Sequence, residues 1–140
     1  MQNKKYELVL DDTIEFLGRK LFRIRAKISF GIFKKGKLGG YIESENNLSH
    51  FGNAWVSDNA LVCDDAFVCG NAFVYGNAKV SGNAWVSDNA RVSDNALVCG
   101  NAFVYGNALV YGNAKVCDDA FVYGYARGYR DWETDRKSVV

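Results

Sequence analysis

One six-residue unit, repeated without a break, constrains this chain more than any other feature. Valine recurs every six residues from Val56 to Val122, which places twelve valines in one register. An alanine stands two residues before each valine, and Gly-Asn, Asp-Asn or Asp-Asp precedes each alanine. A repeat of this length indicates a solenoid, in which each unit is one small structural element.

The unit itself predicts a short strand followed by a corner. Residues two apart in an extended segment share a face, so alanine and valine point to one side and the two variable positions to the other. Glycine, asparagine and aspartate tolerate positive φ and bond locally to the backbone, as a tight corner requires. Because so short a strand cannot bury its apolar face alone, the hexads are expected to stack as a parallel β-solenoid.

From Gly52 to Ala126 the repeat resembles that of the hexapeptide, or bacterial transferase hexapeptide, family of left-handed parallel β-helix proteins. The resemblance implies a triangular coil of three hexads, or 18 residues, and so four coils between Gly52 and Tyr123. The left-handed winding rests on the resemblance alone. Parallel crossovers are otherwise almost always right-handed, so a right-handed β-helix is the alternative.

The segment Lys34–Ala54 is similar to the leading segment of small uncharacterised hexapeptide-repeat proteins of bacteria and their phages. We expect it to form an imperfect first coil. Ile42 and Leu48 are six residues apart and are predicted to take the valine position, with His50 and Phe51 as a two-residue insertion before the regular coils.

Residues 1–38 are predicted to be a β-rich cap over the open end of the β-helix, which spans 39–129. The segment 21–30 alternates, with Phe22, Ile24, Ala26, Ile28 and Phe30 on one face and Arg23, Arg25 and Lys27 on the other, as in a half-buried strand. Residues 17–20, Leu-Gly-Arg-Lys, indicate the turn of a β-hairpin. The fold class is thus all-β, a left-handed parallel β-helix with an N-terminal β-hairpin cap.

The last residues do not continue the repeat. Gly128 takes the valine position, and residues 130–140 follow no pattern. The final six, 135–140, resemble the in-frame translation of a widely used sequencing adapter, so we interpret them as an assembly artefact.

Composition narrows the class of protein. The 140 residues carry a formal net charge of +1 and 49% hydrophobic residues, which excludes a disordered tail or a basic nucleic-acid arm. Neither an apolar run of membrane-spanning length nor a signal sequence is present, which favours a cytoplasmic location without membrane contact. Cys63, Cys69, Cys99 and Cys117 all follow valine, and we expect reduced thiols, with Cys99 and Cys117 as stacked neighbours. Neither a metal site nor a cofactor is expected.

With a period of 18 residues, the outward positions fall on three faces. The third face carries two columns. The column before valine is aromatic and comprises Phe67, Trp85, Phe103 and Phe121. The column after valine comprises Cys69, Ser87, Tyr105 and Tyr123. Such an apolar strip is typical of a contact surface, and hexapeptide proteins are commonly trimers by resemblance. The alternatives are stacked rings that only stabilise the ladder and a surface for a ligand or foreign partner.

Three functional classes remain open. The first is a self-associating scaffold, for which we favour a trimer and consider a phage origin. The second is a sequestering binder of a nucleotide or other anionic small molecule in phage counter-defence. It would use the aromatic columns together with Arg23, Arg25 and Lys27. Binding of long nucleic acid is not expected. The third is an acyl-coenzyme A-dependent acyltransferase, for which the resemblance implies a histidine base, and His50 is the single histidine. We favour a non-enzymatic scaffold or binder, because no loop interrupts the coils and fold alone does not imply function.

Overall fold

The computed structural model describes residues 4–125 and 127–128, and among these every regular element except one short 3-10 helix is a β-strand. Three longer strands and the 3-10 helix come first: β1 (Tyr6–Phe16), β2 (Arg19–Ala26), β3 (Leu38–Ile42) and η1 (Glu45–Asn47). The two-residue strands of the repeat follow: β4 (Trp55–Val56), β5 (Leu61–Val62), β6 (Phe67–Val68), β7 (Phe73–Val74), β8 (Lys79–Val80), β9 (Trp85–Val86), β10 (Arg91–Val92), β11 (Leu97–Val98), β12 (Phe103–Val104), β13 (Leu109–Val110), β14 (Lys115–Val116), β15 (Phe121–Val122) and β16 (Arg127–Gly128). The tail predicted at 130–140, with its proposed artefact at 135–140, lies outside the described residues.

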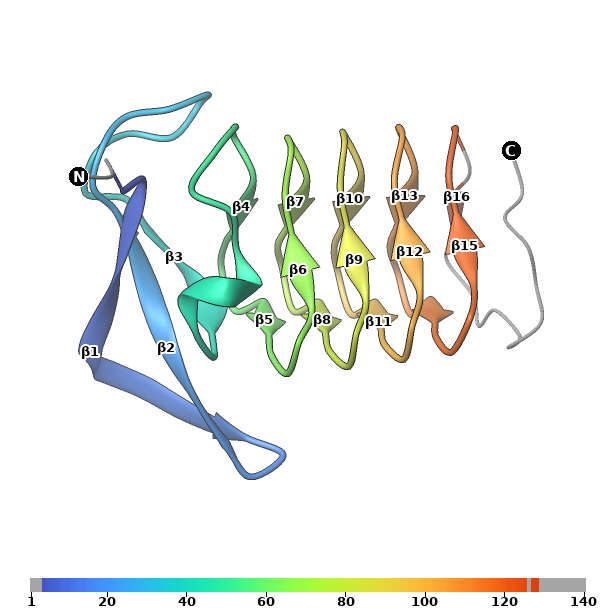
Figure 1. Cartoon of the computed structure of the whole chain (residues 1–140), viewed down its shortest axis with the longest axis horizontal. Helices are drawn as coiled ribbons and strands as arrows, with labels where there is room; N and C mark the ends of the chain where they lie inside the picture. The colour runs from blue at the N-terminus through green and yellow to red at the C-terminus, as the bar shows by residue number, and fades with distance from the viewer. Residues whose placement is uncertain (1–3, 126, 129–140) are drawn as a thin grey trace.

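The short strands stack into three parallel sheets, one for each face of a solenoid (Figure 1). The first face is β4, β7, β10, β13 and β16; the second is β5, β8, β11 and β14; the third is β6, β9, β12 and β15. Each residue pairs with the residue 18 positions later, as Val56 does with Val74. The predicted parallel solenoid and its 18-residue register are therefore confirmed, down to the pairing of Gly128 with Val110 at the predicted end of the valine column.

The core is the inward column of alanine and valine. Every repeat alanine from Ala54 to Ala120 and every repeat valine from Val56 to Val122 has no exposed surface. Each strand donates backbone N–H groups to carbonyls of the next coil, for example from Trp55 N to Ala72 O at 3.0 Å. Stacked β-branched side chains and an unbroken hydrogen-bond ladder stabilise the coils together, which a single hexad could not achieve.

One column of corners alternates aspartate and glycine along the solenoid axis, in the order Asp58, Gly76, Asp94 and Gly112. Asp58 and Asp94 hold positive φ angles of 59°, a conformation that favours glycine. In each case a carboxylate oxygen accepts the N–H of the glycine one coil later, at 3.2 Å from Gly76 and 3.0 Å from Gly112. The aspartate of one coil therefore supports the corner of the next.

The first coil is irregular in the predicted way. Ile42 pairs with Val62, and Leu48 bridges to Val68, so both take the valine position as predicted. Each pair is separated by two residues more than the regular coil, which confirms the insertion before Gly52. The β3 glycines fit the close approach of β3 to β4, because a Cβ on Gly39 would lie 2.5 Å from the Val56 carbonyl oxygen.

Some carbonyls of the first regular coil accept N–H groups of the irregular coil before it, such as Ala60 O from Tyr41 N at 3.0 Å, whereas side chains bind others. Lys5 Nζ donates to Ala54 O at 2.6 Å, and Asn47 Nδ2 donates to Ala66 O at 2.8 Å and Asp64 O at 3.2 Å. Both donors are buried. A sheet edge left open would expose unpaired carbonyls, so these contacts close the N-terminal end of the solenoid.

The β1–β2 hairpin pairs antiparallel with β3 and extends the second-face sheet (Figure 1). Leu17 and Gly18, with φ of 52° and 77°, form its turn as predicted, whereas Arg19 and Lys20, also predicted in the turn, belong to β2. The hairpin also covers the outer side of β5, where Leu21, Tyr41, Leu61 and Cys63 form a second buried cluster. The chain therefore buries residues on both sides of this sheet.

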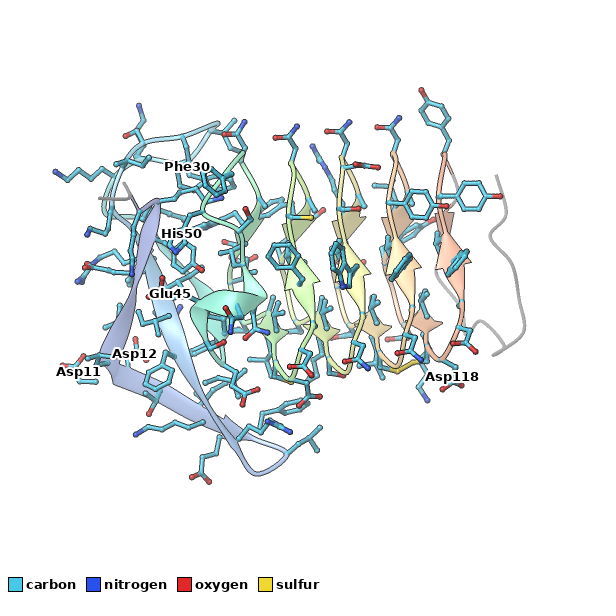
Figure 2. The ribbon with its side chains drawn as sticks, viewed as in Figure 1. Asp11, Asp12, Phe30, Glu45, His50 and Asp118 are labelled. Atoms are coloured by element: carbon cyan, nitrogen blue, oxygen red, sulfur yellow. A yellow bond between two sulfur atoms is a disulfide. The ribbon has the colours of Figure 1, made fainter. Side chains whose placement is uncertain are left out.

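The expected strand over 21–30 is too long. Strand β2 ends at Ala26, and Ile28 is 46% exposed rather than part of an apolar face. The following loop, which carries Phe30 (Figure 2), folds back, and Phe30 bridges to Phe33 while both rings pack on Trp55. The alternation fails there because the aromatic side chains pack on the first face rather than on the hairpin.

The expectation of four reduced cysteines is wrong for one pair. Cys99 and Cys117 are stacked neighbours, as predicted, but they form a disulfide (Figure 2). Their Cα atoms lie 4.5 Å apart, because the two residues occupy the same position in successive coils. Cys63 and Cys69 are free.

Candidate functional site

The third face presents a continuous ladder of aromatic rings. Phe67, Trp85, Phe103 and Phe121 follow one another on β6, β9, β12 and β15, with ring centroids 5.3, 6.1 and 5.4 Å apart. Trp85 is 45% exposed, Phe103 40% and Phe121 36%. The ladder thus combines mutual packing with a large accessible apolar surface.

The second column of this face adds to its apolar character. Tyr105 and Tyr123 stack with centroids 5.2 Å apart. The two columns contain no charged residue, whereas the first face carries Arg91 and the second carries Lys79 and Lys115. The third face is thus the least polar of the three.

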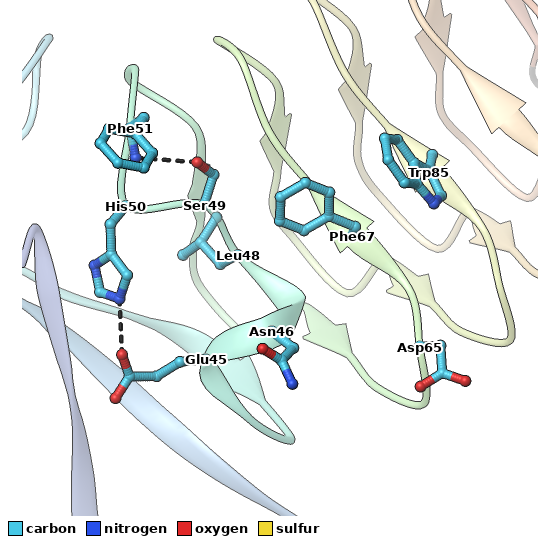
Figure 3. Close-up of a pocket in the computed structure, with 9 residues that line it drawn as sticks. All are labelled: Glu45, Asn46, Leu48, Ser49, His50, Phe51, Asp65, Phe67 and Trp85. Atoms are coloured by element: carbon cyan, nitrogen blue, oxygen red, sulfur yellow. Dashed lines mark hydrogen bonds and ion pairs between the residues drawn. The ribbon is translucent and has the colours of Figure 1, made fainter.

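A cavity of about 470 Å³ lies where the ladder meets η1 (Figure 3). Phe67 and Trp85 form one wall, and the segment around His50 forms the other. The ionisable side chains that line it, other than His50, are the carboxylates of Glu45 and Asp65. Such a lining does not favour an anionic ligand.

His50 is held on both ring nitrogens. Nδ1 accepts the Lys5 backbone N–H at 3.1 Å, so Nε2 carries the proton and donates to a Glu45 carboxylate oxygen at 2.8 Å (Figure 3). The ring also stacks on Tyr6 at 4.0 Å. Burial raises the pKa of Glu45, but hydrogen bonds from His50 and Lys4 outweigh this effect and leave the pKa below its usual value. A general base needs a free nitrogen lone pair directed at a substrate, and here that lone pair already accepts a backbone N–H.

The basic residues predicted to bind an anion lie elsewhere and are largely paired. Arg23 donates to Asp12 at 2.9 Å and to Gly39 O at 2.7 Å, and it also bonds the Tyr41 hydroxyl. Arg25 pairs with Glu7 at 2.7 Å, and Lys27 is exposed beyond the end of β2. All three belong to the hairpin and its exit, so the structure does not bring them together with the aromatic columns of the third face.

The first face contains a cavity that the sequence reasoning did not identify as a site. A volume of about 350 Å³ is lined by Tyr75, Arg91, Ser93, Asp94, Leu109 and Tyr111. The repeat does contain a sequence feature that points to this cavity, because a serine stands between two tyrosines when residues 18 positions apart are compared. Without the stacked coils, however, a serine in a column does not by itself indicate a cavity.

The corner aspartates do not gather into a metal site. Among residues 4–125 and 127–128, no group of three or more histidine, cysteine, aspartate or glutamate side chains could hold a metal ion. In the same part of the chain, no helix has the length and apolar character needed to cross a bilayer.

Comparison with known proteins supports the repeat architecture. Residues 66–82, 72–88, 84–100 and 102–118 match a family model described as YdcK Beta solenoid repeat. No curated protein matches the chain. The matched residues lie within the regular coils, so the chain is similar to a β-solenoid repeat family in the part that forms the stacked sheets.

Proposed function

We propose that this chain is a non-enzymatic β-solenoid scaffold that associates with further copies of itself through the third face. One observation carries the proposal: the ladder from Phe67 to Phe121 is exposed, continuous and free of charged side chains in its own and the adjacent column. Contiguous apolar surfaces on proteins usually mark contact sites.

A second copy is the partner that fits the face best. The rings repeat once per coil, so a matching surface needs side chains with the same spacing, which another copy supplies by construction. Association removes exposed aromatic surface from water, and aromatic residues dominate the energy of such contacts. The absence of like charges across the contact means that no electrostatic repulsion opposes it.

The size of the face predicts a weak and concentration-dependent association. Four coils spaced about 4.8 Å apart make the face about 20 Å high, and one strand with its corner makes it about 20 Å wide. The face therefore has an area of roughly 400 Å² per copy. Stable complexes bury about 800 Å² per partner, so this contact is expected to be in the micromolar range or to need a closed ring. The trimer implied by the hexapeptide resemblance is such a ring, and we include it in the proposal.

Acyl transfer is not part of this proposal. His50 is the single histidine, and its ring binds Lys5 and Glu45 while it stacks on Tyr6. These contacts support a role for His50 in joining the hairpin to the first coil.

Sedimentation velocity over a wide concentration range tests the scaffold proposal. We expect a reversible shift to larger species for the unmodified protein, and we expect Trp85→Thr/Phe103→Thr to remain monomeric. Leu97→Thr, in the matching position of the second face, is the control and should associate like the unmodified protein. A monomer at every concentration, or equal association by the double variant, would contradict the proposal.

A further inference from the structure

The first-face cavity has the form of an aromatic ladder with one ring missing. Tyr75, Ser93 and Tyr111 occupy one column on successive coils. In the corresponding third-face column, Tyr105 and Tyr123 stack at 5.2 Å on adjacent coils. Two coils rise about 9.6 Å, which leaves room for one flat ring between Tyr75 and Tyr111. Tyr75 itself stacks on Phe73 of its own coil, with ring centroids 4.5 Å apart.

We propose that this gap binds a planar, amino-substituted aromatic ring that carries an anionic group. The ring would lie over Ser93 between Tyr75 and Tyr111, which line the cavity. Ser93 is 7% exposed and forms the floor. The ligand would supply the ring that the protein's own column lacks.

Arg91 determines the charge of the ligand. Of the four arginines between residues 4 and 125, Arg19, Arg23 and Arg25 each pair with a carboxylate, whereas Arg91 has no ion pair in this part of the chain. Its side chain is exposed and lies beside the column of Ser93. An unpaired guanidinium at the edge of an aromatic slot is suited to a carboxylate or phosphate.

Asp94 accounts for the amino group. One carboxylate oxygen accepts the Gly112 N–H at 3.0 Å, and the other remains able to accept a hydrogen bond from a ligand. Arg91 and Asp94 lie on opposite sides of Ser93 along the chain. A ligand with an N–H donor at one end and an anion at the other therefore matches both residues.

Space for the anionic end continues past Arg91. A second cavity of about 190 Å³ shares Arg91 and is also lined by Phe33, Asn53, Asn71 and Phe73. Its side-chain amides and aromatic rings are suited to a polar group such as a sugar. Two chemical sources share the required features, namely purine nucleotides and aminoaryl carboxylates.

Titration calorimetry with AMP, adenosine and 4-aminobenzoate tests this site. We expect the unmodified protein to bind AMP or 4-aminobenzoate; binding of one alone would identify the source of the ring. If AMP binds, Arg91→Gln should weaken AMP by about tenfold or more and leave adenosine unchanged, because the variant removes a charge-assisted contact. If 4-aminobenzoate alone binds, Arg91→Gln should weaken it similarly.

The decisive variant is Ser93→Tyr, which fills the gap with the missing ring. We expect it to keep the thermal stability of the fold and to abolish binding. Ser87→Tyr, the same change in the corresponding column of the third face, should bind like the unmodified protein. The inference is overturned if neither anionic probe binds, or if Ser93→Tyr binds as well as Ser87→Tyr. The site and the proposed self-association involve different faces, so either can fail without the other.

Discussion

Lys5 shows how single residues close the solenoid where the repeat stops. Its side chain is 1% exposed, donates to Ala54 O and Gly52 O, and lies 4.8 Å from the centre of the Phe30 ring. Burial lowers the pKa of Lys5 from 10.5 to about 8. The ammonium is therefore retained near neutral pH against an unfavourable loss of hydration, because it satisfies two otherwise unpaired carbonyls.

The lowered pKa of Lys5 predicts an unusual pH dependence. Above pH 8 the folded protein releases this proton, while the unfolded chain retains it up to about 10.5, so the contribution of Lys5 to stability rises with pH across that range. Denaturant unfolding of the unmodified protein and Lys5→Met between pH 7 and 10 measures the effect as a difference.

Cys63 contributes to the pH dependence of stability in the opposite direction, and comparing the unmodified protein with Lys5→Met removes this contribution. Burial raises the pKa of Cys63 from 9.0 to about 11, so its contribution to stability falls as pH rises above 9. Both proteins retain Cys63. As pH rises from 8 to 10, we expect the free energy of unfolding of the unmodified protein to increase relative to that of Lys5→Met. A difference that does not change with pH would contradict the lowered pKa of Lys5.

At the scale of the element, the disulfide links two neighbouring strands of the second face. Cys99 follows β11 and Cys117 follows β14, and the bond closes a loop of 18 residues. A cross-link of that length removes conformational freedom from the unfolded chain. It lies in the C-terminal half of the solenoid, away from the hairpin that covers the first coil (Figure 2).

Removing this bond should lower stability measurably. Cys117→Ser is expected to reduce the free energy of unfolding by about 3 kcal/mol, the value for a loop of this length. Cys69→Ser removes a free thiol and is expected to change stability by less than about 0.5 kcal/mol. Thiol titration in denaturant without reductant should find two of the four cysteines reactive, and four reactive thiols would contradict the pairing.

At the scale of the whole molecule, the inner and outer surfaces follow different rules. Every hexad presents the same alanine and valine to the core, so hexads are interchangeable inside. Within each outward column, a residue stacks on the residue one coil away, so a change of six residues moves each later side chain to another face. Core formation and surface columns can therefore be separated by deletion.

Two deletions test this separation. Removing residues 70–87 deletes one complete coil and should keep the fold, the columns and the disulfide. Removing residues 106–111 deletes one hexad, which should keep the fold but place Cys99 and Cys117 on different faces. Circular dichroism should show β-structure for both, while thiol titration in denaturant should find two reactive thiols after the first deletion and four after the second. An intact disulfide in the hexad deletion would contradict the 18-residue coil.

The repeat alone predicted stacked parallel strands with every alanine and valine inside, because so short a strand can bury its apolar face only by stacking on others. The 18-residue register, and with it the composition of each outward column, came from the resemblance to hexapeptide-repeat proteins. The repeat also located Ile42 and Leu48 in the first coil. It did not predict that Lys5 and Asn47 bind carbonyls of the solenoid. It also did not predict that the hairpin both extends the second-face sheet and covers the outer side of β5. Both features depend on which segments far apart in the chain meet, and no local pattern encodes that meeting.

One sequence that occurs twice shows what the local sequence determines and what the tertiary structure determines. The nonamer GNAWVSDNA stands at 52–60 and again at 82–90. In both copies alanine and valine are fully buried, as the hexad requires. Trp55, however, is buried beneath Phe30 and Phe33, whereas Trp85 is 45% exposed on the third face. The sequence by itself determined what faces inward, because the side-chain period is local; only the tertiary structure decided which outward residues are covered, because the loop and hairpin that cover them pack across the coils.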